Sequence, residues 1–513
     1  MFRPSRGSSE EQDIFYMDKS STVHGLDACP DLAHRASCSP SMGRLLPARP
    51  RYGPRSGTVS FHFEVDRCRA ERKRDLDRPC IKWPGRGILN AQEDRMDRFV
   101  IEGGRPLHGR AAVRPSKNAL LPCLAAALLT SDRLEFEDSA GLMDIASMLQ
   151  LLRHLGVETL GAPGGPIALR AASVREPVAP YDLVRRMRAS IVVLGPLLAR
   201  CGRARVSLPG GCAIGARPID QHLKALAALG AEIRLEHGYV EARAERLRGA
   251  EVVFDAVTVG GTENALLAAV LAEGETVLRN AAREPEIVDL AALLRSMGAR
   301  IEGAGTDTIR VHGVESLSGA RHACIPDRVE AGTLLIAGCI TKGDVTVAPA
   351  VPEHLEALLA KLRSMGAAVE ADGGSVRAAC PGGMAPADIV TLPFPGFPTD
   401  LQAQFMALLT QAEGSSTVKE TIFENRFMHV PELGRMGADI RVEGNVAVVT
   451  GPSRLTGAPV MASDLRASAC LVLAGLASRN TTEVRRIYHL DRGYERLEER
   501  LQALGGHVKR VKE

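Results

Sequence analysis

A short motif that recurs six times along the chain constrains its fold more than any other feature. The motif is Leu-x-x-Leu/Met-Gly followed by a strand-like run, and it returns at intervals of 68 to 74 residues. An amphipathic helix that ends at a glycine in the left-handed conformation, and then a β-strand, explains this pattern. The sequence therefore predicts a repeat protein of the α/β class. The motif glycines are Gly156, Gly230, Gly298, Gly366, Gly437 and Gly505.

A second element accompanies each copy, a helix-length run of small and apolar residues. These runs have almost no polar face, so each predicted helix has to be buried. Ser116, Thr262, Thr399 and Asp464 stand where a helix N-cap is expected. Pro122 and Pro196 predict that the first two helices are kinked or begin later than the runs themselves. The six runs span residues 116–132, 188–202, 262–274, 330–343, 399–414 and 464–480.

Buried helices and repeated strands together predict helices inside and sheets outside, with three units in each of two domains. We expect the first domain at residues 117–325, and the second at residues 96–116 together with 326–513. The cleft between them is the natural ligand site. A repeat scaffold that only binds partners is the alternative. It is less favoured because the unusual polar residues lie in the segments that differ between repeats.

Residues 1–95 differ from this body. They are rich in Arg, Pro, Ser and Gly, contain the only tryptophan, Trp83, and show no sustained period. The periodic pattern begins at Met96. We interpret the leader as upstream sequence translated from a misplaced start codon, with a regulatory tail as the alternative, and we expect the body to work without it.

Charge and cysteine usage exclude several classes of protein. Residues 96–513 hold 47 Lys and Arg against 48 Asp and Glu, so the basic footprint of a nucleic-acid binder is absent there. The longest apolar stretch, near residues 119–129, is shorter than the roughly 20 residues of a membrane span. The 11 cysteines form no C-x-x-C pair, which predicts reduced thiols in a cytoplasmic enzyme and no zinc or other metal site. No nicotinamide, P-loop or zinc-protease motif occurs.

The segment 207–220, SLPGGCAIGARPID, is the strongest candidate for chemistry. Its glycines allow Cys212 to be presented to solvent, and Arg217 lies five residues further on. A nearby guanidinium favours the thiolate and lowers a thiol pKa. A buried, inert cysteine is the competing interpretation, and spacing alone leaves it open.

Cations near the ends of predicted elements form a second candidate group. Lys117 follows the predicted cap at a helix N-terminus, where ammonium and backbone amides together attract phosphate or carboxylate. Each of these cations alone is more often structural, but together they indicate a substrate with several anionic groups. Asp400 is either a helix cap or a base for a sugar hydroxyl. The other cations are Arg188, Arg466 and Arg492.

Several stretches together resemble the enolpyruvyl transferase family, from about Met96 to the end of the chain. They are KNALLP, YDLVRRMRASI, SLPGGCAIGARPID, NAAREPEIVD, FPTDLQAQF, FENRFMHVPEL, DLRASA and RIYHLDRGYERL. The resemblance implies an inside-out α/β barrel of two domains, each with three repeats. It also implies transfer of the enolpyruvyl group of phosphoenolpyruvate to the 3-hydroxyl of UDP-N-acetylglucosamine, the first committed step of peptidoglycan synthesis.

The resemblance also assigns residues to the two substrates. Cys212 would donate a proton, and Asp400 would lie near the attacking hydroxyl. Phosphoenolpyruvate would be held by Lys117, Asn118, Arg217 and Arg492. The UDP-sugar site would include Arg188, Arg217, Pro218, Ile219, Asp220, Gln221, Ala256, Val257, Thr258, Val259, Asp400 and Ile422. Supporting roles would fall to Arg426, Asp464 and Arg466.

The implied chemistry is addition followed by elimination, in which cations stabilise phosphate and carboxylate. It requires no metal or other cofactor, and we expect small-molecule substrates without nucleic acid, a membrane span or an obligate protein partner. At Ala256 some members of the family have lysine. A shikimate-pathway enolpyruvyl transferase and a non-catalytic paralogue that binds UDP-sugars remain the alternatives.

Overall fold

The computed structural model describes residues 97–209 and 218–512. The predicted leader, and the loop residues Cys212 and Arg217, lie outside these described residues. All of the described residues belong to one compact unit.

The glycines of the repeated motif end six helices, as the sequence predicts. All six adopt positive φ angles, between 93° and 104°, a conformation that strains any residue with a Cβ atom. Each glycine therefore stops its helix and turns the chain into the next strand. The six helices are α2 (Met143–His154), α5 (Asp220–Ala228), α7 (Pro285–Ser296), α9 (Glu356–Ser364), α11 (Val430–Arg435) and α13 (Leu497–Ala503).

The apolar runs form a second set of six helices that are buried over most of their length. Pro196 lies in the first turn of its helix, which begins later than the run, and the helix with Pro122 gives way to the 3-10 turn η1 (Ala126–Leu129). The prediction of a later start is confirmed for the helix with Pro196, whereas α1 begins at Lys117 and continues through Pro122 to Ala125. The six helices are α1 (Lys117–Ala125), α4 (Leu194–Cys201), α6 (Val259–Ala269), α8 (Arg328–Ile340), α10 (Gln402–Leu409) and α12 (Leu465–Ala477).

Two of the four predicted caps are confirmed and two are wrong. The Ser116 side chain accepts from the Ala119 amide, and Asp464 accepts from two amides at the start of α12. Thr262 lies inside α6, because that helix begins a turn earlier and is capped by Thr258. The Thr399 hydroxyl donates instead to a carboxylate on another segment.

The described strands form six four-stranded sheets with one common order. Within each sheet an edge strand pairs parallel to its neighbour, and the remaining pairs are antiparallel. In the first half of the body the strands are β3 (Arg133–Phe136), β4 (Glu158–Gly161), β5 (Ile167–Arg170), β6 (Val178–Ala179), β7 (Arg203–Ser207), β8 (Glu232–Glu236), β9 (Tyr239–Arg243), β10 (Glu251–Val253), β11 (Glu275–Arg279), β12 (Arg300–Glu302), β13 (Thr308–His312) and β14 (Ala320–His322).

The strands of the other three sheets come from both ends of the described chain. Strand β1 lies between β23 and β24, and β2 completes the sheet of β15. They are β1 (Arg98–Glu102), β2 (His108–Ala112), β15 (Asp344–Ala348), β16 (Ala368–Asp372), β17 (Ser375–Ala379), β18 (Ile389–Val390), β19 (Gly414–Lys419), β20 (Asp439–Glu443), β21 (Val446–Gly451), β22 (Pro459–Met461), β23 (Thr481–Arg485) and β24 (His507–Val511).

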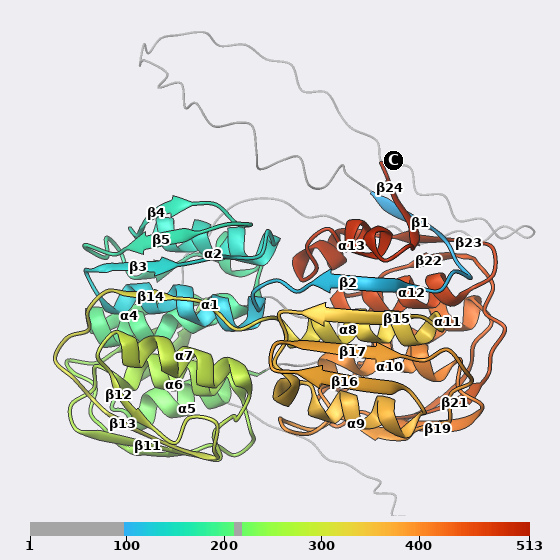
Figure 1. The fold of residues 1–513 in the computed structure, drawn as a ribbon. Helices are drawn as coiled ribbons and strands as arrows, with labels where there is room; N and C mark the ends of the chain where they lie inside the picture. Colours follow the sequence, from blue (N-terminus) through green and yellow to red (C-terminus); the bar gives the residue numbers. More distant parts are fainter. Residues whose placement is uncertain (1–96, 210–217, 513) are drawn as a thin grey trace, which may run out of the picture. The chain divides into compact units, whose positions relative to one another are not determined.

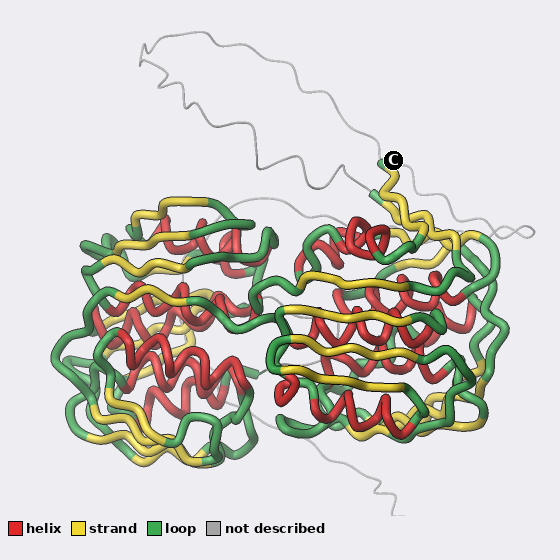
Figure 2. Tube along the Cα trace, viewed as in Figure 1, coloured by secondary structure: helices red, strands yellow, loops and turns green. Residues whose placement is uncertain are grey.

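Two separate hydrophobic cores divide these elements into two lobes. The first lobe packs around buried residues between Leu120 and Leu317, and the second around residues 99–113 and 329–508. In the second lobe α8 packs against β15 and β17, and the strands cover the helices in Figures 1 and 2. No described helix has both the length and the apolarity to cross a membrane. The exact domain boundaries stay a prediction.

The two passages of the chain between the lobes pair with each other. Pro115 and Pro326 form an isolated antiparallel bridge. The Ser116 amide donates to the Ile325 carbonyl at 2.8 Å, and the Asp327 amide donates to the backbone carbonyl of Arg114 at 2.9 Å. The residue before Lys117 is thereby tied to the start of the second lobe.

Glu263, buried in α6, makes the stability of the first lobe depend on pH. Burial, together with the nearby carboxyls of Glu286 and Glu284, raises the pKa of Glu263 from 4.5 to about 8. The native state therefore keeps a proton that the unfolded chain releases, so stability falls as pH rises between these two values. At pH 8.5 we expect the free energy of unfolding of Glu263→Gln to exceed that of the parent by on the order of 2 kcal/mol. At pH 4.5 the two values should differ little.

Thermal unfolding across this pH range checks the effect, with the exposed Glu232→Gln as the matched control. If Glu263→Gln is more stable than the parent by the same amount at pH 4.5, the effect does not come from titration of the Glu263 carboxyl.

Candidate functional site

Two cations from different lobes meet at one buried carboxylate. Lys117, the first residue of α1, donates through Nζ to Asp144 Oδ2 at 3.0 Å. Arg492 ends the 3-10 helix η5 (Ile487–Arg492) of the second lobe and donates through Nε to Asp144 Oδ1, also at 3.0 Å. The side chains of Lys117 and Asp144 are only 10% and 7% exposed. The sequence thus brings two predicted site residues together around a third that sequence analysis missed.

The electrostatics of this cluster favour an added anion. Burial acts to raise the pKa of Asp144, but Lys117 and Arg492 outweigh it and hold the pKa below its usual value. One ionised carboxylate therefore balances only one of the two positive charges. A phosphate or carboxylate of a ligand would satisfy the excess charge beside the N-terminus of α1.

A second cluster surrounds Asp400. Its Oδ1 accepts from Arg426 Nη2 at 2.9 Å, and its Oδ2 accepts from Arg466 Nη2 at 2.7 Å. Asp400 makes no capping hydrogen bond within its short helix η4 (Thr399–Leu401), so the cap interpretation is wrong. The carboxylate is 30% exposed while the two arginines are nearly buried, which leaves its accessible side free for a ligand.

The Asp400 carboxylate is firmly ionised. Burial acts to raise the pKa of Asp400, but Arg466 and Arg426 lower it far below the usual value, and Lys117 contributes to the same effect. Because Lys117 influences Asp400, the two clusters belong to one electrostatic site. In this arrangement Asp400 accepts hydrogen bonds well and takes up a proton poorly.

A buried hydrogen-bond network fixes the arginine that holds Asp400. Arg466 donates to the Tyr494 hydroxyl at 3.3 Å, and Gln404 donates to the same hydroxyl at 3.1 Å. Gln404 also donates to the backbone carbonyl of Asp400 at 2.9 Å. Asp464 caps the helix that carries Arg466. These contacts hold the guanidinium in one orientation.

Glu420 connects Asp400 to the loop of Ile422. The buried Glu420 carboxylate accepts from the amide of Ile422 at 2.8 Å and from that of Phe423 at 3.2 Å. Its other oxygen accepts from the hydroxyl of Thr399, the neighbour of Asp400, at 3.0 Å. Two predicted ligand residues are therefore positioned by one acid that the sequence did not single out.

The remaining predicted residues form a third group in the first lobe. Arg188 begins the 3-10 helix η2 (Arg188–Val193) and donates to the Pro218 carbonyl at 3.4 Å. Gln221, near the start of α5, donates to Asp255 at 3.0 Å and accepts from the Asp255 amide at 2.9 Å. These contacts link the segments 218–221 and 256–259 of the prediction. Ala256 and Val257 are exposed, while Ile219 and Val259 are half-buried.

The sequence also predicts site roles for Cys212, Arg217, Asn118 and Asp220. Cys212 and Arg217 lie outside the described residues, so their roles stay predictions. Asn118 is half-buried in α1 beside Lys117, and Asp220 is exposed in the first turn of α5.

Sequence comparison finds relatives along most of the chain. A family model described as EPSP synthase (3-phosphoshikimate 1-carboxyvinyltransferase) matches residues 101–501. A protein of Anaeromyxobacter sp. (strain Fw109-5) named UDP-N-acetylglucosamine 1-carboxyvinyltransferase is 60% identical over 421 residues, which cover 81% of this chain and 100% of the relative. A protein of Myxococcus xanthus (strain DK1622) with the same name is 55% identical, with the same two coverages.

Solved structures with a similar fold include two enolpyruvyl transferases. NikO from Streptomyces tendae matches with a TM-score of 0.74 and 28% identity, over 82% of this chain and 100% of that chain. An EPSP synthase from Acinetobacter baumannii matches with a TM-score of 0.63 and 18% identity, over 81% of this chain and 100% of that chain. The second likeness concerns the fold alone.

Removing the Asp144 charge tests the anion site directly. Asp144→Asn leaves Lys117 and Arg492 without their shared carboxylate, and a broken buried pair costs about 3 kcal/mol. We therefore expect Asp144→Asn to have a lower melting temperature than the parent at pH 7. Added inorganic phosphate should raise the melting temperature of the variant more than that of the parent. The lowered pKa of Asp144 keeps its contribution present at neutral pH, and the contribution is lost as pH falls through that pKa, so the variant and the parent should converge in acid.

Asp138→Asn is the matched control, because Asp138 pairs with Arg114 at a more exposed position. The anion site is refuted if phosphate stabilises Asp144→Asn no more than it stabilises the control and the parent.

Proposed function

Because the chain belongs to the EPSP synthase family of carboxyvinyltransferases, we propose that it transfers the enolpyruvyl group of phosphoenolpyruvate to the 3-hydroxyl of UDP-N-acetylglucosamine and releases phosphate. The observation that carries this function is the 55–60% identity to proteins of that name across their whole length. This reaction is the first committed step of peptidoglycan synthesis. The protein therefore contributes to cell-wall formation and, through it, to cell shape and division.

For the fold, we propose that each lobe is an inside-out α/β barrel of three repeated units, with domains at 117–325 and at 96–116 plus 326–513. The six sheets of common order and the buried helices support this arrangement. Substrates would bind between the lobes, where Lys117 and Arg492 meet. We propose a cytoplasmic location, since both substrates are cytoplasmic metabolites, and no obligate protein partner.

Phosphoenolpyruvate would be bound by Lys117, Asn118, Arg217 and Arg492. Its phosphate and carboxylate carry the negative charge that the Asp144 cluster lacks. Lys117 and Arg492 come from different lobes, so an anion held by both would draw the lobes together. Asp144 keeps the two cations near each other before the substrate arrives.

The UDP-sugar would lie along the group of Arg188, the segments 217–221 and 256–259, Asp400 and Ile422. A carboxylate held by Arg426 and Arg466 is a strong hydrogen-bond acceptor. Asp400 would therefore orient the 3-hydroxyl for attack. Because its pKa is so low, it would act as a base only after its arginine contacts change.

The reaction would proceed by addition and elimination. The 3-hydroxyl gives its proton to Asp400, once the arginine contacts of that carboxylate have changed, and its oxygen bonds to C2 of phosphoenolpyruvate. At the same time C3 gains a proton, which we assign to Cys212. Loss of a proton from C3 and departure of phosphate then restore the double bond. The cations stabilise the charge on phosphate and carboxylate in both steps, and the chemistry needs no cofactor.

The substrate is tested by phosphate release from phosphoenolpyruvate. We expect turnover with UDP-N-acetylglucosamine and none with shikimate 3-phosphate. Arg466→Lys is expected to lower kcat by roughly 10²-fold, because one amine cannot reproduce the planar contact to Asp400. Arg435→Lys, at an exposed position, is the control. Turnover with shikimate 3-phosphate would assign the chain to the other branch, and no turnover with either acceptor would indicate a binding protein.

Selective alkylation tests the assignment of Cys212. A phosphonate epoxide such as fosfomycin carries an anion that the cations should hold, and its ring carbon can bond to the loop thiolate. Burial raises the pKa of Cys339 to about 12, and Cys123 and Cys470 are also fully buried, so these thiols should be inert. We expect one adduct, faster labelling with the UDP-sugar present, no labelling of Cys212→Ser, and drug-resistant activity in Cys212→Asp.

Peptide mass spectrometry locates the adduct. An adduct on another cysteine, or an active enzyme that resists labelling, would overturn the assignment.

A further inference from the structure

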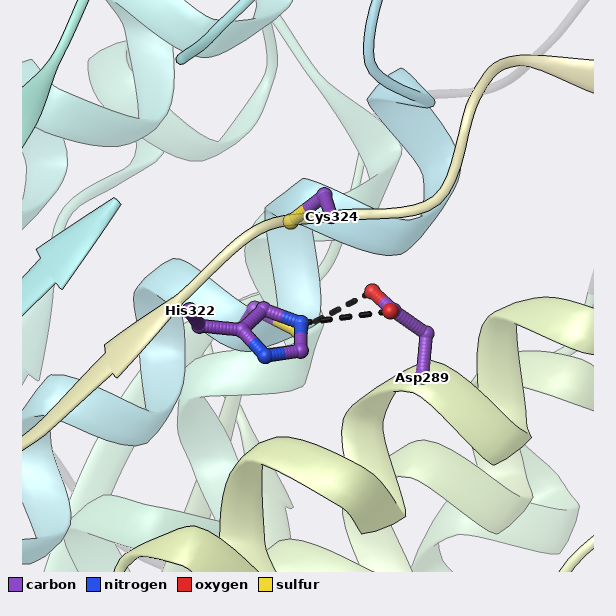
Figure 3. Close-up of side chains that lie close together, drawn as sticks. Asp289, His322 and Cys324 are labelled. Atoms are coloured by element: carbon purple, nitrogen blue, oxygen red, sulfur yellow. Dashed lines mark hydrogen bonds and ion pairs between the residues drawn. The ribbon is translucent and has the colours of Figure 1, made fainter. Parts of the chain in front are cut away.

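Four side chains with metal-binding atoms converge in the first lobe. They are Cys123, Asp289, His322 and Cys324, and one donor atom of each lies within 4.8 Å of all the others. Cys123 belongs to α1, Asp289 to α7, and the other two to the end of β14 and the residues after it. Figure 3 shows the His322 ring directed at the Asp289 carboxylate, with Cys324 beside them. The proposed reaction uses none of the four.

The distances are close to those of a tetrahedral metal site. Cys123 Sγ lies 3.9 Å from Asp289 Oδ2, and His322 Nε2 lies 3.2 Å from Asp289 Oδ1. Tetrahedral zinc with ordinary bond lengths places sulfur and oxygen ligands about 3.6 Å apart, and nitrogen and oxygen ligands about 3.4 Å apart. Each of these two pairs is therefore within a few tenths of an ångström of the required spacing. The two contacts use different oxygens of Asp289, so a small rotation of the carboxylate is needed to bring one oxygen to the ion.

The surroundings also suit a structural ion. Cys123 is fully buried, and the side chains of Asp289 and His322 are 4% and 11% exposed. Two sulfurs, one imidazole and one carboxylate form a complete ligand set for zinc, which leaves no open position for a substrate. Asp289 also lines a cavity of about 330 Å³, so an ion can approach the site from the side of this ligand.

We propose that Cys123, Asp289, His322 and Cys324 bind one Zn²⁺ ion as a structural site. The two thiols lose their protons on binding, so affinity rises with pH. The ion joins α1, α7 and the strand β14 within the first lobe. Cys324 precedes Ile325, whose carbonyl accepts from Ser116, so the metal stiffens the passage between the lobes beside Lys117.

Cobalt provides the first test, because it reports geometry without a mutation. Metal-free, reduced protein titrated with Co²⁺ should develop thiolate charge-transfer absorption and intense tetrahedral d–d bands that saturate at one ion per chain. Zn²⁺ should displace the cobalt and raise the melting temperature by several degrees. An octahedral spectrum, or no stoichiometric binding, would overturn the proposal.

Variants identify the ligands. Cys324→Ser and His322→Gln should each weaken zinc binding at least 10²-fold and abolish the thermal gain, while Cys201→Ser, at a similarly half-buried cysteine, should keep both. Cys212→Ser should also keep the ion, which separates this site from the reactive loop. If Cys324→Ser fails to fold, Cys324→Val offers an apolar substitute with the same expected loss.

A disulfide between Cys123 and Cys324 is the rival explanation for the two close sulfurs. Mass spectrometry of protein purified without reductant distinguishes them. Cross-linked peptides in most of the molecules would refute the metal site, whereas free thiols protected from alkylation by Zn²⁺ would support it. Because these measurements do not depend on turnover, they test the metal site independently of the proposed enzyme activity.

Discussion

Six helices without a polar face set the constraint on which the rest of this structure depends. Residues such as Leu120, Leu266 and Leu471 are fully buried, and a helix of this kind is stable in water only if other elements enclose it on every side. The sheets and the six motif helices supply that cover. A repeated unit meets this requirement, because the same set of two helices and four short strands can be used again for each face of a lobe.

The same constraint decides where polar chemistry can lie. A buried helix exposes polar groups only at its ends, and the first turn also offers unpaired amides. Lys117 stands at the start of α1, Asp400 just before α10, and Arg466 in the first turn of α12. The site is therefore assembled from helix starts in both lobes, and it can be complete only when the two lobes are held together, as Asp144 holds Lys117 and Arg492.

The sequence could predict features that depend on neighbouring residues, but not contacts between residues that are far apart in the chain. The motif glycines, the Ser116 and Asp464 caps and the buried helices follow from spacing and residue type. The predicted N-caps at Thr262 and Thr399 were wrong, because a threonine before an apolar run resembles a cap even where the helix begins elsewhere. Asp144 was missed since an acid in a first helical turn is usually explained by the helix dipole. The metal-type cluster could not be predicted, because Cys123 and Cys324 are far apart in the chain and meet only because α1 and β14 both pack against α7.

The position of β1 has a consequence for biosynthesis. This strand lies near the start of the body, yet both of its partners, β23 and β24, follow the whole first lobe and most of the second lobe in the chain. The first lobe contains all of its own strands and can form while translation continues. Residues 98–102 have to wait, with their apolar positions Phe99 and Ile101 unpaired, until β23 and β24 have been synthesised. Pairing over a long sequence separation is slow in general, so we expect completion of the second lobe to follow that of the first, with β1 exposed in the interval.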